Sequence, residues 1–193
     1  VLGEDQIIGQ LKTAFEASRA ADGIGPLLED AITKAIHVGE RARTETAINE
    51  GVVSLGSAAV QLAERELDLS DATALVVGAG EMGTLAANAL DAAGVDRLLV
   101  ANRTIPHATH IAETVETDAS AIGLDAAASA AETAAVVITA TGSPEYVLDT
   151  EGLTEAGRTI CIDLAQPRDI APEVDAITGV ELFDIDALES VTE

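Results

Sequence analysis

A glycine-rich segment is the part of this sequence whose residue types and spacing are most specific for chemistry. It comprises Gly78, Ala79, Gly80, Glu81, Met82 and Gly83. It follows the apolar residues 75–77 and precedes an alanine-rich stretch, an order typical of dinucleotide-binding folds. The first glycine permits a tight turn, the second lets the backbone approach a pyrophosphate, and the third allows close packing of helix on strand. Because a strand, the loop, a helix and a second strand follow one another in this order, the segment predicts a nucleotide-binding loop rather than a turn without a ligand.

The residues after the second predicted strand bear on the choice between NAD and NADP. An NAD-binding domain usually places Asp or Glu there to accept a hydrogen bond from the ribose 2′-hydroxyl. This chain has Asn102, Arg103 and Thr104 instead. The guanidinium of Arg103 can pair with a 2′-phosphate, and Asn102 and Thr104 can donate hydrogen bonds to it, so NADPH is favoured as the cofactor. The alternative is that Arg103 is a solvated loop residue.

Two other turns follow predicted strands. Thr141 and Gly142 belong to a turn of small residues, which either leaves room for the nicotinamide ribose or is a plain turn. Arg168 and Asp169 follow a later strand, and we expect them to form an ion pair with each other rather than to contact a substrate.

No covalent nucleophile and no metal site can be assigned within this chain. Cys161 lies between two isoleucines in a predicted strand, so we expect a core position and an unreactive thiol. His37, His107 and His110 have no cysteine or carboxylate at metal-ligand or catalytic-triad spacing. We expect all three histidines to be structural or exposed to solvent.

The elements that must position these residues alternate between short apolar segments and helical segments. The predicted strands are Ala74–Val77, Arg97–Ala101, Ala135–Ala140, Thr159–Leu164 and Val180–Phe183. The predicted helices between them are Met82–Ala93, Pro106–Val115 and Ala126–Ala135. This alternation predicts an α/β fold with a doubly wound parallel sheet, a Rossmann-like NADP-binding domain.

Upstream of that domain the apolar residues recur at helical spacing. We predict helices over Asp5–Ala20, from Pro26 onward, and over about Ser54–Leu67, with a linker at Thr44–Val53. We expect two domains, the helices of residues 1–48 and the nucleotide-binding domain of residues 49–193.

The amino-acid composition indicates the kind of organism and the classes of ligand to expect. The chain has 34 acidic and 10 basic residues, which gives a net charge of −24. Only two of the basic residues are lysines, Lys12 and Lys34. Such acidity spread along a folded chain is typical of an extreme halophile and leaves no basic groove for a polyanion. Aromatic residues make up only 2%, which argues against stacking platforms for bases. Without an apolar run of membrane-spanning length or an initial Met, we expect a piece of a longer cytoplasmic protein, not one in a membrane.

Several motifs resemble those of glutamyl-tRNA reductases. They are residues 1–12, 41–46, 53–60, 78–83, 102–104 and 167–169. The resemblance covers nearly the whole chain, and the motif from Gly3 to Gln10 is highly specific to that family. It implies reduction of the glutamyl group of glutamyl-tRNA(Glu) by NADPH to glutamate-1-semialdehyde, at the start of tetrapyrrole (porphyrin) biosynthesis. It also implies that the nucleophilic cysteine, which forms a thioester, lies upstream of this chain, since Cys161 does not match it.

The resemblance implies further roles. Residues 1–48 would be the last helices of the catalytic domain, and residues 49–193 the NADPH-binding domain, followed in the family by a helical dimerisation domain. A homodimer is therefore expected, with glutamate-1-semialdehyde aminomutase as a further partner. The substrate-binding positions would be Glu4, Asp5, Gln6 and Gln10. Gln6 and Gln10 are four residues apart and so share one face of a helix.

Two other functions compete with this interpretation. An NADP oxidoreductase similar to shikimate dehydrogenase shares the glycine loop and an Asn-Arg-Thr strand end, but needs a catalytic Lys and Asp in an upstream domain. Lys12 and Lys34 lie on predicted helices without that setting. The third alternative is a non-catalytic NADP-binding module, which would bind the nucleotide without turnover.

Overall fold

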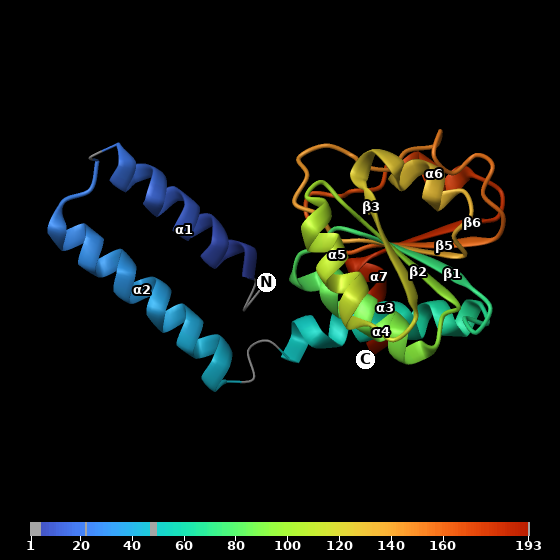
Figure 1. Cartoon of the computed structure of the whole chain (residues 1–193), viewed down its shortest axis with the longest axis horizontal. Coiled ribbons are helices and arrows are strands. Elements are labelled where there is room, and N and C mark those ends of the chain that lie inside the picture. Colours follow the sequence, from blue (N-terminus) through green and yellow to red (C-terminus); the bar gives the residue numbers. More distant parts are fainter. Residues whose placement is uncertain (1–4, 22, 47–49, 193) are drawn as a thin grey trace. The chain divides into compact units, whose positions relative to one another are not determined.

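The computed structural model describes residues 5–21, 23–46 and 50–192 and divides into two compact units (Figure 1). The first unit is Val1–Val53 and the second is Ser54–Glu193. Within the described residues, no helix has both the length and the apolar character needed to cross a membrane.

The first unit contains a pair of helices, α1 (Asp5–Ala20) and α2 (Pro26–Glu45). Pro26 occupies the first turn of α2, where its missing N–H costs no hydrogen bond. Two ion pairs join the helices, Lys12 with Glu40 at 2.6 Å and Arg19 with Glu29 at 3.0 Å. Because the earlier residue of α1 pairs with the later residue of α2, the two helices run antiparallel. Exposed pairs of this kind stabilise only weakly.

The boundary between the two units falls at the end of the predicted linker Thr44–Val53, but much of that segment is helical. Helix α2 continues through Glu45, and α3 (Glu50–Glu66) begins before the predicted linker ends, while residues 47–49 lie outside the described residues. The prediction weighted a glycine and mixed polarity in this segment. A single glycine lowers helix stability by only about 1 kcal/mol, which neighbouring turns can overcome.

The second unit is built on one six-stranded sheet in the order β3-β2-β1-β4-β5-β6. The strands are β1 (Thr73–Val77), β2 (Arg97–Asn102), β3 (Asp118–Gly123), β4 (Val136–Thr139), β5 (Thr159–Asp163) and β6 (Val180–Asp184). Every neighbouring pair is parallel. The chain winds outward from β1 to β3 and then returns to β4 beside β1, so the order reverses between β1 and β4. This confirms the predicted doubly wound parallel sheet.

Helices and loops cover both faces of the sheet. The remaining elements are α4 (Glu81–Ala93), α5 (Ile105–Thr114), η2 (Leu124–Ala126), α6 (Ala127–Ala131), η3 (Pro172–Ala176) and α7 (Ile185–Thr192). Side chains from α3, α4, α5 and α7 pack on one face of the sheet. On the other face α6, η3 and the loops after β4 and β5 pack (Figure 1).

Strand β1 shows how the sequence produces this two-sided burial. Ala74 and Val76 belong to one apolar cluster and Leu75 and Val77 to the other, and all four side chains are fully buried. Successive strand residues point to opposite faces, so a strand covered on both sides needs an unbroken apolar run. That run is what made β1 predictable.

Strand β3 was not predicted. Its sequence, Asp118–Gly123, contains small and polar residues with little preference for strands, and it lies half-buried at the edge of the sheet. Backbone pairing with β2 in parallel register, from Asp118 opposite Arg97 to Gly123 opposite Asn102, defines it. The predicted helix at Ala126–Ala135 is also shorter in the structure, where α6 ends at Ala131.

Candidate functional site

The glycine loop connects β1 to α4 and is closely packed at its first and third glycines. Gly78 has φ +110°, and a Cβ there would lie 2.5 Å from the carbonyl oxygen of Ala140. A Cβ on Gly83 would lie 1.9 Å from the carbonyl oxygen of Gly78. Any larger side chain at either position would displace backbone, so packing alone accounts for both glycines.

Gly80 differs from its two neighbours. It is the residue that caps α4 at its N-terminus, and no atom of a described residue outside its immediate neighbours lies within 4 Å of the position that a Cβ would take. Packing in the described part of the chain therefore does not require a glycine there. The open space beside the N-terminus of a 13-residue helix is where the backbone N–H groups and the helix dipole favour an anion.

The other loop residues line this position to different extents. Ala79 is half-buried, Glu81 is exposed, and the side chain of Met82 packs against the apolar cluster beneath. A ligand at this loop would thus meet backbone groups of Met82 rather than its side chain.

Asn102 ties the glycine loop to the end of β2. Its Oδ1 accepts a hydrogen bond from the N–H of Ala79 at 3.3 Å, and its Nδ2 donates to the carbonyl of Thr104 at 3.0 Å. Asn102 therefore holds the loop in place, a role that the sequence analysis did not assign to it. Arg103 and Thr104 beside it are exposed, and Arg103 forms no ion pair within the described part of the chain.

The turn after β4 is fixed by a buried carboxylate. The N–H of Thr141 donates to Oδ2 of Asp169 at 2.7 Å, and its hydroxyl donates to Oδ1 at 2.5 Å. The hydroxyl oxygen of Thr141 also accepts from the N–H of Ser143 at 3.0 Å. Gly142 is exposed beside it. The conformation of this turn is therefore stabilised by a residue 28 positions further along the chain.

The predicted ion pair between Arg168 and Asp169 is wrong. Arg168 is exposed and pairs with Asp184 at the end of β6, whereas Asp169 is fully buried and bound to Thr141. The two consecutive side chains point in opposite directions, which sequence adjacency alone does not reveal.

Asp163 is a site residue that the sequence analysis missed. It ends β5, and its Oδ1 accepts from the hydroxyl of Thr139 and the N–H of Ala165, each at 3.0 Å. Its Oδ2 accepts from the N–H groups of Asp169 and Ile170, also at 3.0 Å. An acidic residue at the end of an otherwise apolar strand was the available signal, because a buried carboxylate needs such partners.

Burial raises the pKa of Asp169, and the nearby charge of Asp163 raises it further, while the hydrogen bonds from Thr141 lower it. Burial also raises the pKa of Cys161 to about 12, with a smaller contribution from the charge of Asp163. Cys161 is fully buried, as predicted.

The predicted substrate-binding residues lie in the other unit. Gln10 is exposed on α1. Asp5 and Gln6 belong to the first turn of α1, but their side chains, like the whole of Glu4, lie outside the described residues. The shared face of Gln6 and Gln10 therefore stays a prediction. The three histidines are exposed, and the described residues contain no cluster of side chains suited to a metal ion.

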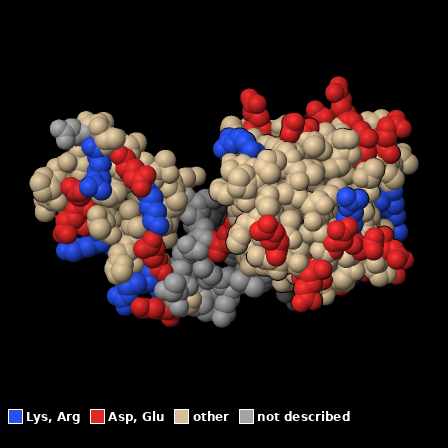
Figure 2. Space-filling view, in the orientation of Figure 1, with Lys and Arg blue, Asp and Glu red and all other residues tan. Residues whose placement is uncertain are grey.

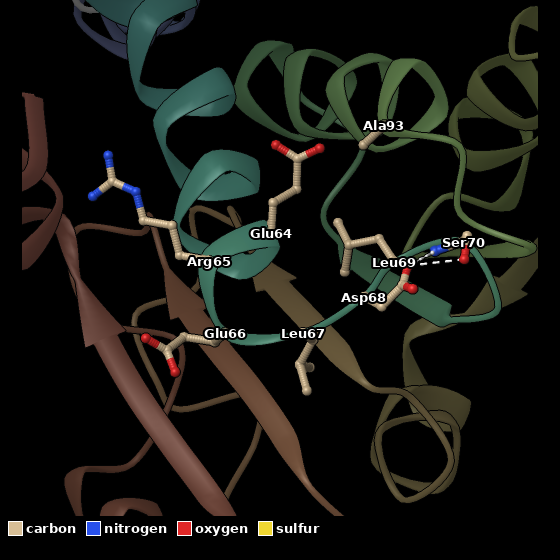
Figure 3. A pocket seen from close by; sticks show the side chains of 8 residues that line it. All are labelled: Glu64, Arg65, Glu66, Leu67, Asp68, Leu69, Ser70 and Ala93. Atoms are coloured by element: carbon tan, nitrogen blue, oxygen red, sulfur yellow. Dashed lines mark hydrogen bonds between the residues drawn. The ribbon is translucent and has the colours of Figure 1, made fainter.

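A separate pocket lies at the end of α3 and the turn before β1 (Figure 3). It is lined by Glu64, Arg65, Glu66, Leu67, Asp68, Leu69, Ser70 and Ala93. Asp68 accepts hydrogen bonds from the N–H and the hydroxyl of Ser70, at 3.0 and 2.8 Å. The pocket is at the start of β1, whereas the glycine loop follows its end, and its three acidic residues disfavour a phosphate. We do not assign the nucleotide to it.

Two known families match the chain, one on each side of the boundary between the two compact units. Residues 1–46 match the family described as glutamyl-tRNA(Glu) reductase, N-terminal domain. Residues 61–191 match the family described as shikimate/quinate 5-dehydrogenase.

The chain is also similar to individual glutamyl-tRNA reductases and shikimate dehydrogenases. The chain is 61% identical over 192 residues to the glutamyl-tRNA reductase of Haloarcula marismortui, spanning 100% of this chain but 43% of that protein. The solved structure of the glutamyl-tRNA reductase from Methanopyrus kandleri has a TM-score of 0.66 at 39% identity, covering 98% of this chain and 49% of that one. A shikimate 5-dehydrogenase from Thermus thermophilus, solved with NADP(H) and shikimate, has a TM-score of 0.52 at 26% identity and covers 70% of this chain and 52% of that one. The chain thus spans less than half the length of its Haloarcula relative.

Proposed function

This chain belongs to the glutamyl-tRNA reductase family, its residues 61–191 carrying the domain shared with shikimate/quinate 5-dehydrogenases, and we propose that it supplies the NADPH site of such a reductase. The whole protein would reduce the glutamyl group of glutamyl-tRNA(Glu) to glutamate-1-semialdehyde, the first step of tetrapyrrole biosynthesis. It would act in the cytoplasm as a homodimer, with glutamate-1-semialdehyde aminomutase as the consumer of its product.

The observation that carries the cofactor assignment is the contrast within the glycine loop. Gly78 and Gly83 are required by packing, whereas the space at Gly80 is open and faces the N-terminus of α4. A pyrophosphate can occupy that space and accept hydrogen bonds from backbone N–H groups. The residues present therefore fit a dinucleotide.

We expect the two halves of the dinucleotide to lie over the ends of two different strands. In a doubly wound sheet the ligand lies across the point where strand order reverses, here between β1 and β4. The adenosine half would lie over the end of β2, where Arg103 can pair with the 2′-phosphate. The other half would lie over the end of β4, beside Thr141 and Gly142. When bound, NADPH supplies a hydride.

The acyl group that receives the hydride would be a thioester on a cysteine that this chain does not contain. Cys161 cannot replace that cysteine, because it is fully buried in β5 and its pKa is raised to about 12. A nucleophilic thiol must be accessible and ionised. We therefore assign no catalytic residue within this chain, and expect that residues 1–193 alone form no semialdehyde.

The substrate would be held in the helical unit. Glu4, Asp5, Gln6 and Gln10 are proposed to bind the glutamyl region, by their match to the family motif. Amide side chains can both donate to a carboxylate and accept from an ammonium group.

Neither lysine of this chain fits the role of the catalytic lysine in a shikimate-type reaction. That reaction needs a catalytic lysine, but Lys12 and Lys34 form exposed surface ion pairs with Glu40 and Asp30, at 2.6 and 2.9 Å. We therefore do not propose a shikimate dehydrogenase.

Arg103 provides the direct test of the cofactor. We expect NADPH to bind more tightly than NADH, and Arg103→Ala to weaken NADPH binding by about one to two orders of magnitude while leaving NADH unchanged, since one charge-assisted contact is lost. Isothermal titration in molar KCl measures both ligands. Equal affinities for NADPH and NADH in the unmodified chain would contradict the 2′-phosphate assignment.

The reaction itself is tested on the full-length protein. Incubation with glutamyl-tRNA in the absence of NADPH should leave a thioester on the protein, detectable as a mass increase that hydroxylamine removes. Nucleotide binding with neither thioester nor turnover would support a non-catalytic NADP-binding module instead.

A further inference from the structure

We infer that Asp169, anchored by Asp163, is a positioning residue that fixes the Thr141 turn against the glycine loop and so determines where the nicotinamide half of the cofactor lies. The inference rests on the proposed function, because it concerns the geometry of the proposed NADPH site. Asp163 and Asp169 are both buried, and neither is proposed to contact the ligand directly.

Asp163 anchors the loop that carries Asp169. Asp163 is only 2% exposed, and four donors surround its carboxylate. Two of them are the N–H groups of Asp169 and Ile170, which lie six and seven residues further along the chain. A third is the hydroxyl of Thr139 on the neighbouring strand β4. Asp163 therefore fixes the backbone at Asp169 relative to the ends of both β4 and β5.

The second step runs from Asp169 to the turn after β4. Both oxygens of its carboxylate accept from Thr141, one from the N–H and one from the hydroxyl. Asp169 is fully buried, so no water competes for these bonds. This two-point attachment fixes both the backbone and the side-chain rotamer of Thr141.

The third step is the contact between this turn and the glycine loop. A Cβ on Gly78 would lie 2.5 Å from the carbonyl oxygen of Ala140 and 3.2 Å from Cγ2 of Thr141. The turn and the loop are thus in direct van der Waals contact. A shift of Thr141 would change the wall on the β4 side of the proposed cofactor site, but not the β2 side, where Asn102 and Arg103 lie.

An apolar side chain at this position would leave the N–H and the hydroxyl of Thr141 without their acceptor, so the carboxylate is what attaches the turn at two points. What the carboxylate adds is direction, because it accepts from two donors of one residue at the same time. We expect this geometry to matter for the nicotinamide half of the ligand specifically.

The experiment compares two ligands in the full chain in molar KCl. NADPH contains both halves, whereas 2′-phosphoadenosine 5′-diphosphoribose lacks the nicotinamide ring. The variants are Asp169→Ala, which removes both acceptors, and Thr141→Val, which removes the hydroxyl donor and keeps the N–H. Asp169→Asn is the conservative rescue, since its amide can accept from the N–H of Thr141 and donate to its hydroxyl oxygen. Arg168→Ala is the matched control, because that neighbouring side chain is exposed and pairs with Asp184.

We expect Asp169→Ala and Thr141→Val to weaken NADPH binding by about tenfold, to leave the shorter ligand within about twofold, and Asp169→Asn to restore part of the loss. Arg168→Ala should bind both ligands like the unmodified chain. If Asp169→Ala does not fold, as far-ultraviolet circular dichroism would show, Thr141→Val decides alone.

Equal losses for both ligands, or no loss for either, would overturn the inference while leaving the proposed NADPH site intact. Failure of the unmodified chain to bind either ligand would instead overturn the proposed cofactor, and the inference with it.

Discussion

Among single residues, the aspartate that ends β5 and the aspartate in the loop after it have different surroundings. Asp163 receives four hydrogen bonds from three segments, whereas Asp169 receives two, both from Thr141. Burial raises the pKa of Asp169, the two hydrogen bonds from Thr141 lower it, and the nearby charge of Asp163 raises it. A carboxylate whose pKa is raised in the folded state makes stability depend on pH in a definite direction.

Asp169 should therefore make the folded chain less stable as pH rises. Its unfolded pKa is about 3.9, and its folded pKa is higher. Above pH 4 the folded state retains a proton that the unfolded state has lost, so stability falls with rising pH until the folded pKa is passed. Asn does not titrate, so the melting temperature of the unmodified chain minus that of Asp169→Asn should decrease from pH 4 to pH 7. A difference that is constant or grows over this range would contradict the prediction.

Cys161 should be unreactive in the folded chain. With a pKa of about 12, roughly one thiol in ten thousand is ionised at pH 8, against about a quarter in the unfolded chain. We expect no labelling by iodoacetamide at pH 8 and complete labelling after denaturation in urea, measured by mass spectrometry. Labelling of the folded chain at the same rate as the denatured one would show that β5 is open to solvent.

At the scale of elements, the β1–α4 connection combines two kinds of glycine. Gly83 allows α4 to pack against the carbonyl of Gly78, whereas Gly80 faces open space at the start of the helix. The same sequence pattern thus contains one position that serves the fold and another that is free to serve a ligand. These two roles can be separated by substitution.

Gly83→Ala should destabilise the fold, and Gly80→Ala should affect the ligand. The first places a Cβ 1.9 Å from a backbone oxygen, so we expect a loss of about 3 kcal/mol in the free energy of unfolding, or roughly 6–12 °C in melting temperature. The second should cost less than about 1 kcal/mol, but should remove most of the rise in melting temperature that NADPH produces. Thermal melts with and without NADPH measure both effects. An unchanged NADPH increment in Gly80→Ala would argue against a pyrophosphate at this position.

At the scale of the whole molecule, the charge of −24 on 193 residues opposes compaction. Figure 2 shows that acidic side chains are spread over the visible face of the sheet-containing unit instead of forming one patch. At molar salt the screening length is about 3 Å, shorter than the spacing of most surface charges. The core is rich in alanine, whose small side chains contribute less burial to offset this repulsion.

The chain should therefore require salt for stability. We expect the melting temperature to rise by roughly 10 °C or more between dilute buffer and 2 M KCl, corresponding to a few kcal/mol. Sorbitol, an uncharged osmolyte, acts only through exclusion from the surface and should stabilise less. A melting temperature that is flat or falls with KCl would contradict the halophile interpretation. At such ionic strength long-range attraction contributes little to tRNA binding, which would then depend on shape and on the glutamyl-binding residues.

Features that rest on local patterns could be predicted from the sequence. Unbroken apolar runs predicted the central strands, helical spacing predicted α1 with its bounds, and the spacing of the three glycines predicted the loop between β1 and α4. Arg103 was identified as a candidate because its position after β2 follows from the order of the elements. The motif around Gly3 to Gln10 indicated the family.

Contacts between residues far apart in the chain could not be predicted, and the fold establishes them. The fold creates β3 itself by pairing it with β2 despite its weak strand preference, pairs Asp169 with Thr141 across 28 positions, and joins Asn102 to Ala79 across 23. It also separated Arg168 from Asp169, which adjacency had favoured as a pair. The physical reason is that a buried polar group takes whichever partner the packing brings to it, and strand order sets those partners. Local patterns fix the elements, but the hydrogen bonds between strand ends depend on how the sheet is assembled.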